Sequence, residues 1–141
     1  MGSGARFDRE LWRSSSGPNA AQFRRTVVTP EPANLPGGRR WPATAERLMR
    51  SRFEAFRSGD VEWLLASWHP STRPASVDLS GNPDWQGLQI VDTVDGGPDD
   101  ETGIVEFRAT YSTPHAGLGV HHERSRFVRD HGRWYYLDAM S

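Results

Sequence analysis

The residue best suited to chemistry in this sequence is Glu123, which lies in a segment with the alternating pattern of a β-strand. Alternation places His121, Ser125 and Phe127 on one face together with it, because side chains two residues apart on a strand point the same way. Phe127 indicates that this face points into the core. A carboxylate beside Phe127 and Trp134 would be partly removed from water, and such a group can act as a general acid or base. Glu123 is therefore the first candidate for a catalytic residue.

A structural role for Glu123 is the competing interpretation. Its carboxylate would accept hydrogen bonds from Arg73, from His69 or from a loop backbone, and would tie a helical corner to the sheet. Buried ionic contacts that fix architecture also perturb proton affinity, so the residue type alone does not separate catalysis from structure. Both interpretations remain open at the level of the sequence.

His69 is the second candidate for catalysis. It stands between Trp68 and Pro70 at the end of a predicted helix, where an imidazolium would interact favourably with the last carbonyl groups. As a catalyst it would need a carboxylate such as Glu123 within hydrogen-bond reach, and a cavity that opens onto both groups. Capping and catalysis are thus the two alternatives for this histidine.

Arg73 is a candidate for binding a ligand. It lies between Thr72 and Pro74, and its guanidinium could hold a carboxylate or phosphate through two parallel hydrogen bonds. It could equally pair with an acidic residue of the chain itself. Arg73 is therefore either a pocket anchor or a structural tie.

Metal and nucleotide sites are not indicated by the motifs. Acidic residues surround a Gly-Gly-Pro loop at 96–98, but they lack the alternating Asp/Asn pattern, the central glycine and the distal glutamate of a calcium loop. His121 and His122 are adjacent on a strand, so their side chains point to opposite faces. A glycine-rich phosphate loop, a Gly-x-Ser-x-Gly elbow and a His-Glu-x-x-His motif are all missing from the sequence. We predict neither a metal ion nor a cofactor.

Two helices are predicted before the strands. Thr44 can cap a first helix that ends at Gly59 in a left-handed C-cap. Asp60 can cap a second helix, and Pro70 forces the residue before it out of helical geometry. The inward stripes of the two helices consist of Ala45, Leu48, Met49, Phe53 and Phe56 in the first, and of Val61, Leu64, Leu65 and Trp68 in the second.

Four antiparallel strands are predicted after the helices. Turn-forming residues separate them, and a short hairpin turn at residues 130–132 joins the last two. Helices followed by a meander predict an α+β fold in which the helices cover one face of a strongly curved sheet. The predicted strands are Leu88–Val94, Gly103–Tyr111, Val120–Arg129 and Arg133–Asp138.

The composition of the 141-residue chain fits one globular domain. The sequence contains no cysteine, which excludes disulfides and cysteine-ligated zinc. It has no apolar run of the ~20 residues that cross a bilayer, and no apolar signal core at its start. We therefore expect a cytoplasmic protein that does not enter a membrane.

Residues 1–41 differ from the rest of the chain. They are rich in Ser, Gly, Pro and Asn without a helical or strand period, which predicts an extended or disordered arm before a domain at 42–141. The arm holds seven arginines against three acidic residues, a net charge of +4, whereas the remainder sums to −5. Such an arm could fold back onto its own acidic domain or contact a protein partner. The acidic domain argues against nucleic acid as a partner.

Three segments together resemble the YchJ-type domain of the nuclear transport factor 2-like superfamily. They are LMRSRFEAFRSGDVEWLLASWHPSTR at 48–73, HERSRF at 122–127 and GRWYYLD at 132–138. The resemblance covers about Pro42 to Asp138. Many relatives carry a cysteine-rich SEC-C-type metal segment before this domain, and this chain has an arginine-rich arm in its place. Any zinc-dependent role of those relatives is therefore in doubt for this chain.

The resemblance implies a cone-like fold, in which helices close over a bent sheet and leave a pocket. That pocket would be lined by Trp68, Glu123, Ser125, Trp134 and Tyr136. Pairing of sheets into homodimers is also frequent in the superfamily. The family is largely uncharacterised, so the resemblance transfers no established catalytic residue.

Two hypotheses for function follow. In the first, the chain is a binding or interaction domain, and its pocket holds a small apolar or anionic ligand or a structural network. In the second, it is an enzyme of the isomerase, cyclase or dehydratase type. Glu123 or His69 would then abstract a proton, and Tyr136 or Arg73 would stabilise the developing oxyanion. An open and mostly apolar cavity with Glu123 and His69 exposed at its floor favours the enzyme. A filled interior with Glu123 locked by Arg73 favours the binding domain.

Overall fold

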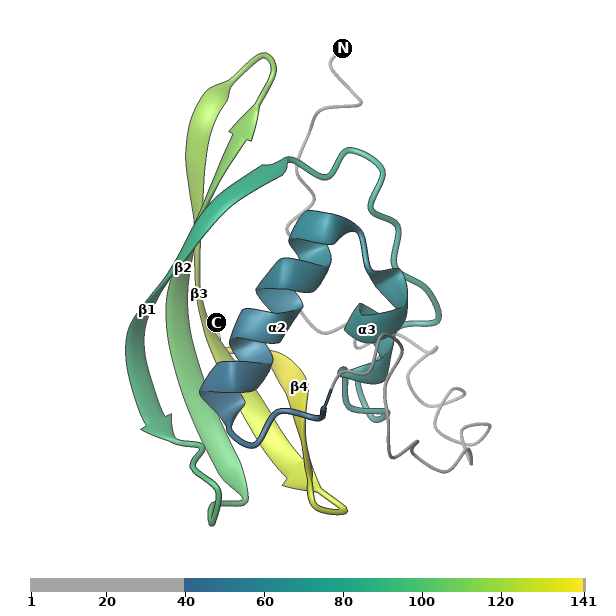
Figure 1. Cartoon of the computed structure of the whole chain (residues 1–141), viewed down its shortest axis with the longest axis vertical. Coiled ribbons are helices and arrows are strands. Elements are labelled where there is room, and N and C mark those ends of the chain that lie inside the picture. Colours follow the sequence, from purple (N-terminus) through teal and green to yellow (C-terminus); the bar gives the residue numbers. More distant parts are fainter. Residues whose placement is uncertain (1–39, 141) are drawn as a thin grey trace.

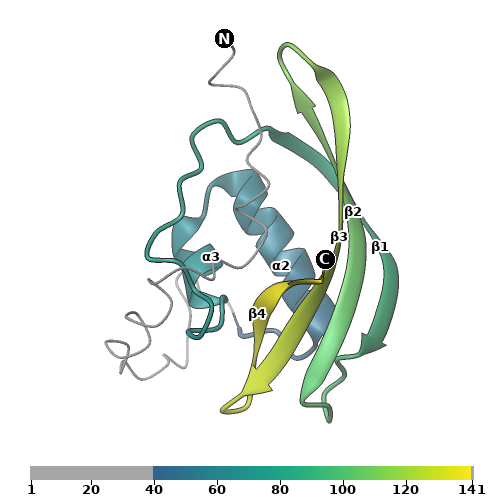
Figure 2. The ribbon, with the colours of Figure 1, turned by 180° about the vertical axis from the view of Figure 1, so that it is seen from behind.

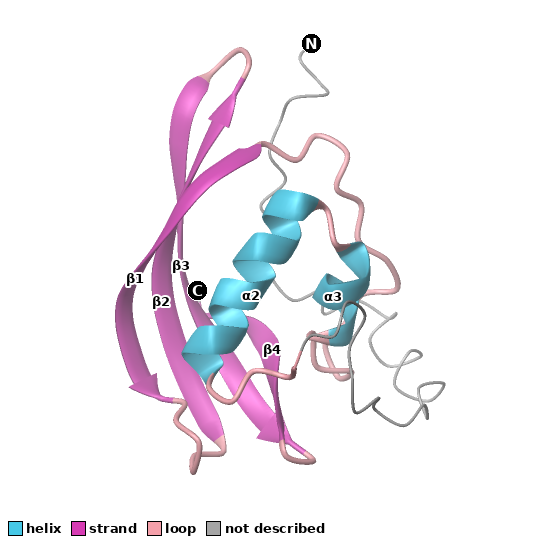
Figure 3. Ribbon diagram, viewed as in Figure 1, coloured by secondary structure: helices cyan, strands magenta, loops and turns pink. Residues whose placement is uncertain are grey.

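The computed structural model describes residues 40–140, and in this part of the chain two helices precede four strands (Figures 1 and 3). The helices are α2 (Ala45–Ser58) and α3 (Val61–Ala66), and the strands are β1 (Asp84–Asp95), β2 (Thr102–Thr113), β3 (Gly117–Asp130) and β4 (Arg133–Met140). This order confirms the predicted α+β class. The arm predicted at 1–41 lies outside the described residues up to residue 39. Neither described helix is long and apolar enough to cross a membrane.

Both helices begin at their predicted caps, and α2 also ends at its predicted C-cap. α3 ends at Ala66, so Trp68, expected on its inward stripe, lies beyond the helix. The Thr44 side chain accepts a hydrogen bond of 3.1 Å from the backbone N–H of Arg47, which satisfies one of the free donors at the start of α2. Gly59 closes α2 with φ 80° and ψ 26°, the left-handed conformation that glycine adopts without steric cost. Asp60 then caps α3 through a 3.0 Å bond from the N–H of Trp63. The tight turn between α2 and α3 is therefore encoded by the residues that form it.

The four strands form one antiparallel sheet in sequence order, β1-β2-β3-β4. The strands are longer than predicted, because Thr113 and Gly117 still pair across the β2–β3 turn and leave a much shorter loop. The turn at 130–132 is confirmed: His131 and Gly132 both have positive φ, 54° and 80°, as a two-residue hairpin of this twist requires. The predicted meander is thus correct in order and direction.

Both helices lie on one side of the sheet, which curves around α2 (Figures 1 and 2). The core fills the space between the two layers, and its residues come from both of them. Side chains with at most 1% of their surface exposed include Leu48, Phe56 and Leu64 from the helices, and Trp85, Phe107 and Phe127 from the sheet. The inward-facing stripe of α2 and the inward faces of the strands are therefore as predicted.

Trp68 and Phe127 meet through Tyr136. The Trp68 ring lies edge-on to Tyr136 with 5.2 Å between ring centres, and Phe127 lies edge-on to Tyr136 at 5.8 Å. Edge-on packing suits aromatic rings because the positive ring edge meets the negative ring face. Tyr136 is therefore the central ring between the corner and the sheet.

Trp41 anchors the start of the domain. Its Nε1–H donates to the backbone carbonyl of Trp134 at 2.8 Å, and its ring packs edge-on against Trp63 and Tyr135. The guanidinium of Arg133 lies 4.8 Å from the centre of the Trp41 ring, within cation–π range. Trp41, the last residue of the predicted arm, thus packs on the domain.

The β1–β2 hairpin packs closely against the start of α2. The N–H of Ala45 donates to the carbonyl of Gly96 at 3.0 Å, and the N–H of Gly96 donates to the carbonyl of Thr102 at 3.1 Å. A Cβ added at Gly103 would lie 2.6 Å from the Cα of Gly96, closer than real carbon atoms approach. Gly103 is therefore required by close approach of two backbones.

We predict that Gly103→Ala lowers the free energy of unfolding by about 2 kcal/mol, because the methyl group must push the two backbones apart. Gly87→Ala is the matched control in β1, since a Cβ there meets nothing within 4 Å. Urea denaturation of both variants measures the difference. Equal effects of the two substitutions would contradict this account of the hairpin.

Candidate functional site

The inward face of β3 carries a buried polar cluster. His121, Glu123 and Ser125 are 4%, 5% and 0% exposed, and Phe127 continues the same face at 1%. Their neighbours point outward, where His122 and Arg124 contact the Glu106 carboxylate at 2.6 and 2.9 Å. The predicted alternation is confirmed, and the adjacent histidines 121 and 122 lie on opposite faces.

Three donors hold the Glu123 carboxylate. The Ser125 hydroxyl donates to Oε2 at 2.6 Å, and the Tyr136 hydroxyl donates to the same oxygen at 3.3 Å. Nε2 of His121 lies 3.1 Å from Oε1. All three partners belong to the sheet. His69, one of the partners expected for this carboxylate, contacts Ser71 and Asp130 instead, and the Nε–H of Arg73 donates to the Trp68 carbonyl.

Arg52 is the functional candidate that sequence reasoning missed. It is 1% exposed, and its Nη1 donates to the Leu64 carbonyl at 2.9 Å and to the Ser67 hydroxyl at 2.7 Å. Its guanidinium carbon lies 5.1 Å from the centre of the Trp68 ring and 4.5 Å from that of Tyr136. The spacing of Leu48, Arg52 and Phe56, four residues apart on the buried stripe, was the available signal.

The charge of Arg52 lies inside the core. Burial lowers the pKa of this guanidinium from 12.5 to about 10, while the negative charge of Glu123 opposes that shift. The side chain therefore stays cationic at neutral pH, and Glu123 supplies a compensating charge. Burial, followed by the nearby Glu123 charge, also raises the pKa of Tyr136 well above 10.0. Tyr136 is thus a neutral hydroxyl that donates to Glu123.

Three buried donors near this cluster have no acceptor in the part of the chain that the structure describes. They are Nη2 of Arg52, Nε1 of Trp68 and Nε1 of Trp134. The other three tryptophans in residues 40–140 are satisfied: Trp41 donates to the Trp134 carbonyl, Trp63 to Ser51 Oγ and Trp85 to Asn82 Oδ1. An unsatisfied buried donor costs about 1–3 kcal/mol, so three of them in one region need an explanation.

The segment after α3, residues 68–73, is called here the Trp-His-Pro corner. Backbone hydrogen bonds fix this corner to β4. The N–H of His69 donates to the Tyr136 carbonyl at 2.8 Å, and the N–H of Tyr136 donates to the Ser67 carbonyl at 2.9 Å. The Thr72 hydroxyl adds a 2.7 Å bond to the carbonyl of Leu137. The Arg73 Nε–H donates to the Trp68 carbonyl at 2.8 Å, which favours the structural tie over the ligand anchor for this residue.

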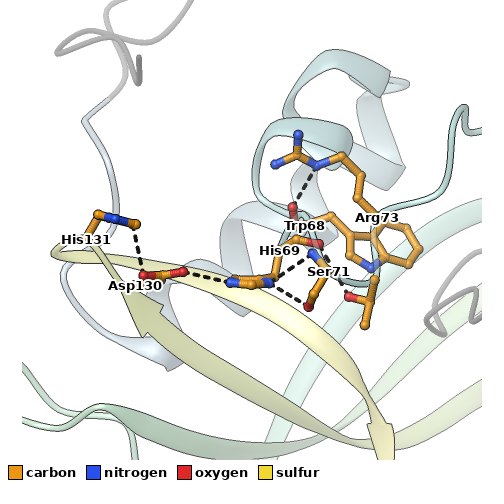
Figure 4. A network of polar contacts seen from close by, with 7 residues as sticks. Trp68, His69, Ser71, Arg73, Asp130 and His131 are labelled. Atoms are coloured by element: carbon orange, nitrogen blue, oxygen red, sulfur yellow. Dashed lines mark hydrogen bonds and ion pairs between the residues drawn. The ribbon is translucent and has the colours of Figure 1, made fainter. Parts of the chain in front are cut away.

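The His69 side chain contacts residues of the corner and of the β3–β4 hairpin (Figure 4). Its Nε2 lies 2.9 Å from Oδ2 of Asp130, and its Nδ1 lies 2.7 Å from Oγ of Ser71. The predicted pair of His69 with Glu123 is therefore wrong. The fold brings Trp68, Glu123, Ser125 and Tyr136 together in the interior and leaves His69 and Arg73 at the corner.

Two hollows lined by residues within 40–140 lie away from the polar cluster. One, of about 300 Å³, lies on the outward side of the sheet and is lined by Val94, Ile104, Arg126, Val128 and Leu137 among others. The other, of about 490 Å³, lies between residues 81–84 and 112–114. Neither is lined by Glu123, His69 or Arg52, so neither is the predicted pocket.

Removal of one donor to Glu123 tests the role of the cluster. We predict that Ser125→Ala lowers the free energy of unfolding by about 2 kcal/mol, because a buried carboxylate loses a hydrogen bond. Ser112→Ala is the control, since Ser112 is partly exposed and faces outward on β2; it should change stability by less than ~0.5 kcal/mol. Urea denaturation measures both, and a neutral Ser125→Ala would contradict a tightly held Glu123.

The pKa of Tyr136 gives a second prediction. Because the folded protein keeps this phenol neutral while the unfolded chain ionises near pH 10, stability from Tyr136 is complete below pH 10 and is lost as the pH rises above it. We expect wild type to lose about 1.4 kcal/mol more than Tyr136→Phe from about pH 9 to about pH 11. Denaturation across this range measures it, and parallel curves would contradict the burial of the hydroxyl.

Comparison with known proteins agrees with this architecture. The family model described as "YchJ, middle NTF2-like domain" matches residues 44–139. UPF0225 protein SCO1677 of Streptomyces coelicolor is 51% identical over 103 residues, which cover 73% of this chain and 79% of that protein. UPF0225 protein CE1570 of Corynebacterium efficiens is 47% identical over 95 residues, 66% of this chain and 70% of that protein.

A solved structure is similar as well. It is the solution structure of RPA3114, a SEC-C motif containing protein from Rhodopseudomonas palustris, with a TM-score of 0.58 and 29% identity over 70% of this chain and 79% of that chain. The helical corner and the curved sheet described above fall within the residues that the family model matches. The chain therefore belongs to the YchJ family and contains its middle NTF2-like domain.

Proposed function

We propose that this chain is a small-ligand-binding domain whose ligand has an apolar body and at least one hydrogen-bond acceptor. The observation that carries the proposal is the set of buried donors without acceptors, Nη2 of Arg52 and Nε1 of Trp68 and Trp134. A ligand oxygen placed among them would satisfy groups that otherwise destabilise the fold. The aromatic rings around them would contact the apolar body.

Geometry supports one common region for two of these donors. The Arg52 guanidinium lies over the Trp68 ring and over the Tyr136 ring, so Nη2 and the Trp68 indole belong to one cluster. Trp134 is two residues before Tyr136 on β4, and both are 1% exposed. The three donors thus come from α2, from the corner and from β4, and all three are buried.

The charges of the cluster favour a neutral acceptor over a second anion. Arg52 and Glu123 are both buried, and their opposite charges already compensate each other. A carboxylate ligand would add an uncompensated negative charge near Glu123, whereas a carbonyl oxygen would not. We therefore infer that an amide or ketone oxygen is a better ligand group than a carboxylate.

The alternative of an isomerase, cyclase or dehydratase has less support. It requires Glu123 or His69 as an available proton acceptor, but the Glu123 carboxylate is held by Ser125, Tyr136 and His121. His69 has its own partners at the corner. Because the predicted acid and base do not meet, the binding hypothesis is the one that we retain.

Indole N–H resonances provide a direct test, since each tryptophan gives its own signal. The protein is titrated with benzamide, with benzoate and with toluene, which share an aromatic body but differ in the acceptor. We expect benzamide to move the Trp68 and Trp134 signals downfield, because a new acceptor hydrogen-bonds these groups. Toluene should not produce this downfield shift.

Trp63 and Trp85 are internal controls, because their indoles already donate to Ser51 and Asn82. Their signals should stay unchanged when benzamide is added. Benzoate should bind more weakly than benzamide. The proposal is withdrawn if none of the probes moves the Trp68 signal, or if all tryptophan signals move together.

A further inference from the structure

A serine, a histidine and an aspartate meet at the Trp-His-Pro corner, outside the interior cluster (Figure 4). Oγ of Ser71 lies 2.7 Å from Nδ1 of His69, and Nε2 of His69 lies 2.9 Å from Oδ2 of Asp130. Asp130 ends β3, whereas the other two residues belong to the corner. Residues far apart in the sequence thus form one continuous hydrogen-bonded chain.

The backbone determines which nitrogen of His69 carries the proton. The N–H of Ser71 donates to Nδ1 of His69 at 3.1 Å, and an amide N–H can only donate. Nδ1 is therefore the acceptor nitrogen of the ring, and the proton of the neutral imidazole lies on Nε2. It follows that Nε2–H donates to the Asp130 carboxylate and that the Ser71 hydroxyl donates to Nδ1.

A tight turn holds these groups in place. The N–H of Thr72 donates to the His69 carbonyl at 3.0 Å, which closes a four-residue turn with Pro70 at its second position. Proline fixes the backbone there, so Ser71 is held against the ring of His69. The His69 ring also packs edge-on against Tyr135, with 5.6 Å between ring centres. The hydroxyl and the imidazole are therefore positioned before any substrate arrives.

We propose that Ser71 is a nucleophile that accepts an activated acyl or phosphonyl group, with His69 as its general base. A hydroxyl that donates to an imidazole, whose other N–H is held by a carboxylate, is the arrangement that activates serine in hydrolases of unrelated folds. Here the two ring nitrogens exchange roles, since the carboxylate binds Nε2 and the serine binds Nδ1. Asp130 is a positioning residue that accepts the Nε2–H of His69 and orients the ring.

The reaction with a fluorophosphonate balances without any further reactant. Oγ of Ser71 attacks phosphorus, the new Oγ–P bond replaces the P–F bond, and fluoride leaves. The hydroxyl proton passes to Nδ1 of His69 and then to solvent. With an activated ester, Oγ attacks the carbonyl carbon and the leaving alkoxide takes the proton from the ring. Solvent can reach the site, since the side chains of His69 and Asp130 are 17% and 43% exposed.

A purely structural clip is the competing explanation, and the two differ in reactivity. A clip would join the corner to the hairpin and leave Ser71 as unreactive as any other serine. A nucleophile would make Ser71 react faster than exposed serines that lack a base. Ser76 is the matched comparison, because it is exposed, lies in the same connection and makes no side-chain hydrogen bond to any residue between 40 and 140.

The test treats the full chain with a fluorophosphonate probe and locates adducts by mass spectrometry of the intact protein and its peptides. We expect one adduct on Ser71, formed about 100-fold faster than any adduct on Ser76. Ser71→Ala should abolish the adduct, and Ser76→Ala should leave its rate unchanged. His69→Gln should slow labelling by about the same factor, because glutamine cannot take up the proton.

The role of Asp130 in reactivity is separated from a role in stability by the labelling rate of folded variants. Asp130→Asn should slow labelling, and Asp130→Glu should restore it, while circular dichroism checks that both variants are folded. The proposal is overturned if Ser71 in the unmodified sequence labels no faster than Ser76, whatever the variants do. It is also overturned if folded His69→Gln labels at the native rate. Neither result bears on the tryptophan signals that test ligand binding.

Discussion

The domain depends on one short stretch of backbone pairing, in which the corner after α3 bonds to β4. The bridge between Trp68 and Tyr136 is parallel and isolated, and two N–H groups, of His69 and of Tyr136, complete it. Because backbone groups cannot bond in the interior without a partner, this bridge fixes the height and direction at which the helices meet the sheet. The edge of β4 is covered by the same contact, which removes an open strand edge.

Tyr136 explains why this bridge matters to the interior. Its backbone pairs with the corner, its ring separates Trp68 from Phe127, and its hydroxyl donates to Glu123. Arg52 then lies over the same ring from the α2 side. A cation and an anion are therefore buried on either side of one aromatic residue. Such groups tolerate burial only when they compensate each other, so the helix layer and the sheet layer are matched in charge as well as in shape.

Much of the fold could be predicted because its signals are local. Thr44 and Asp60 mark helix starts through their side chains, and Gly59 marks a helix end through its backbone conformation. None of these signals depends on distant residues. The inward face of β3 followed from alternation beside Phe127. Arg52 was missed because this chain uses arginine in place of lysine throughout. Arginines on a helix are therefore expected to lie on its exposed face. The contact between His69 and Asp130 was missed because 61 residues separate them in the sequence. No local sequence pattern shows that the β3–β4 hairpin lies beside the Trp-His-Pro corner.

The order of the strands has a consequence for how the chain reaches this structure. Each strand pairs only with its neighbours in sequence through short turns, so the sheet can form by successive hairpins with little loss of loop entropy. The pairing of the corner with β4, in contrast, joins segments that lie on either side of β1, β2 and β3 in the sequence. Helices and sheet are thus two locally encoded units, and the contact that unites them closes a loop that contains three of the four strands.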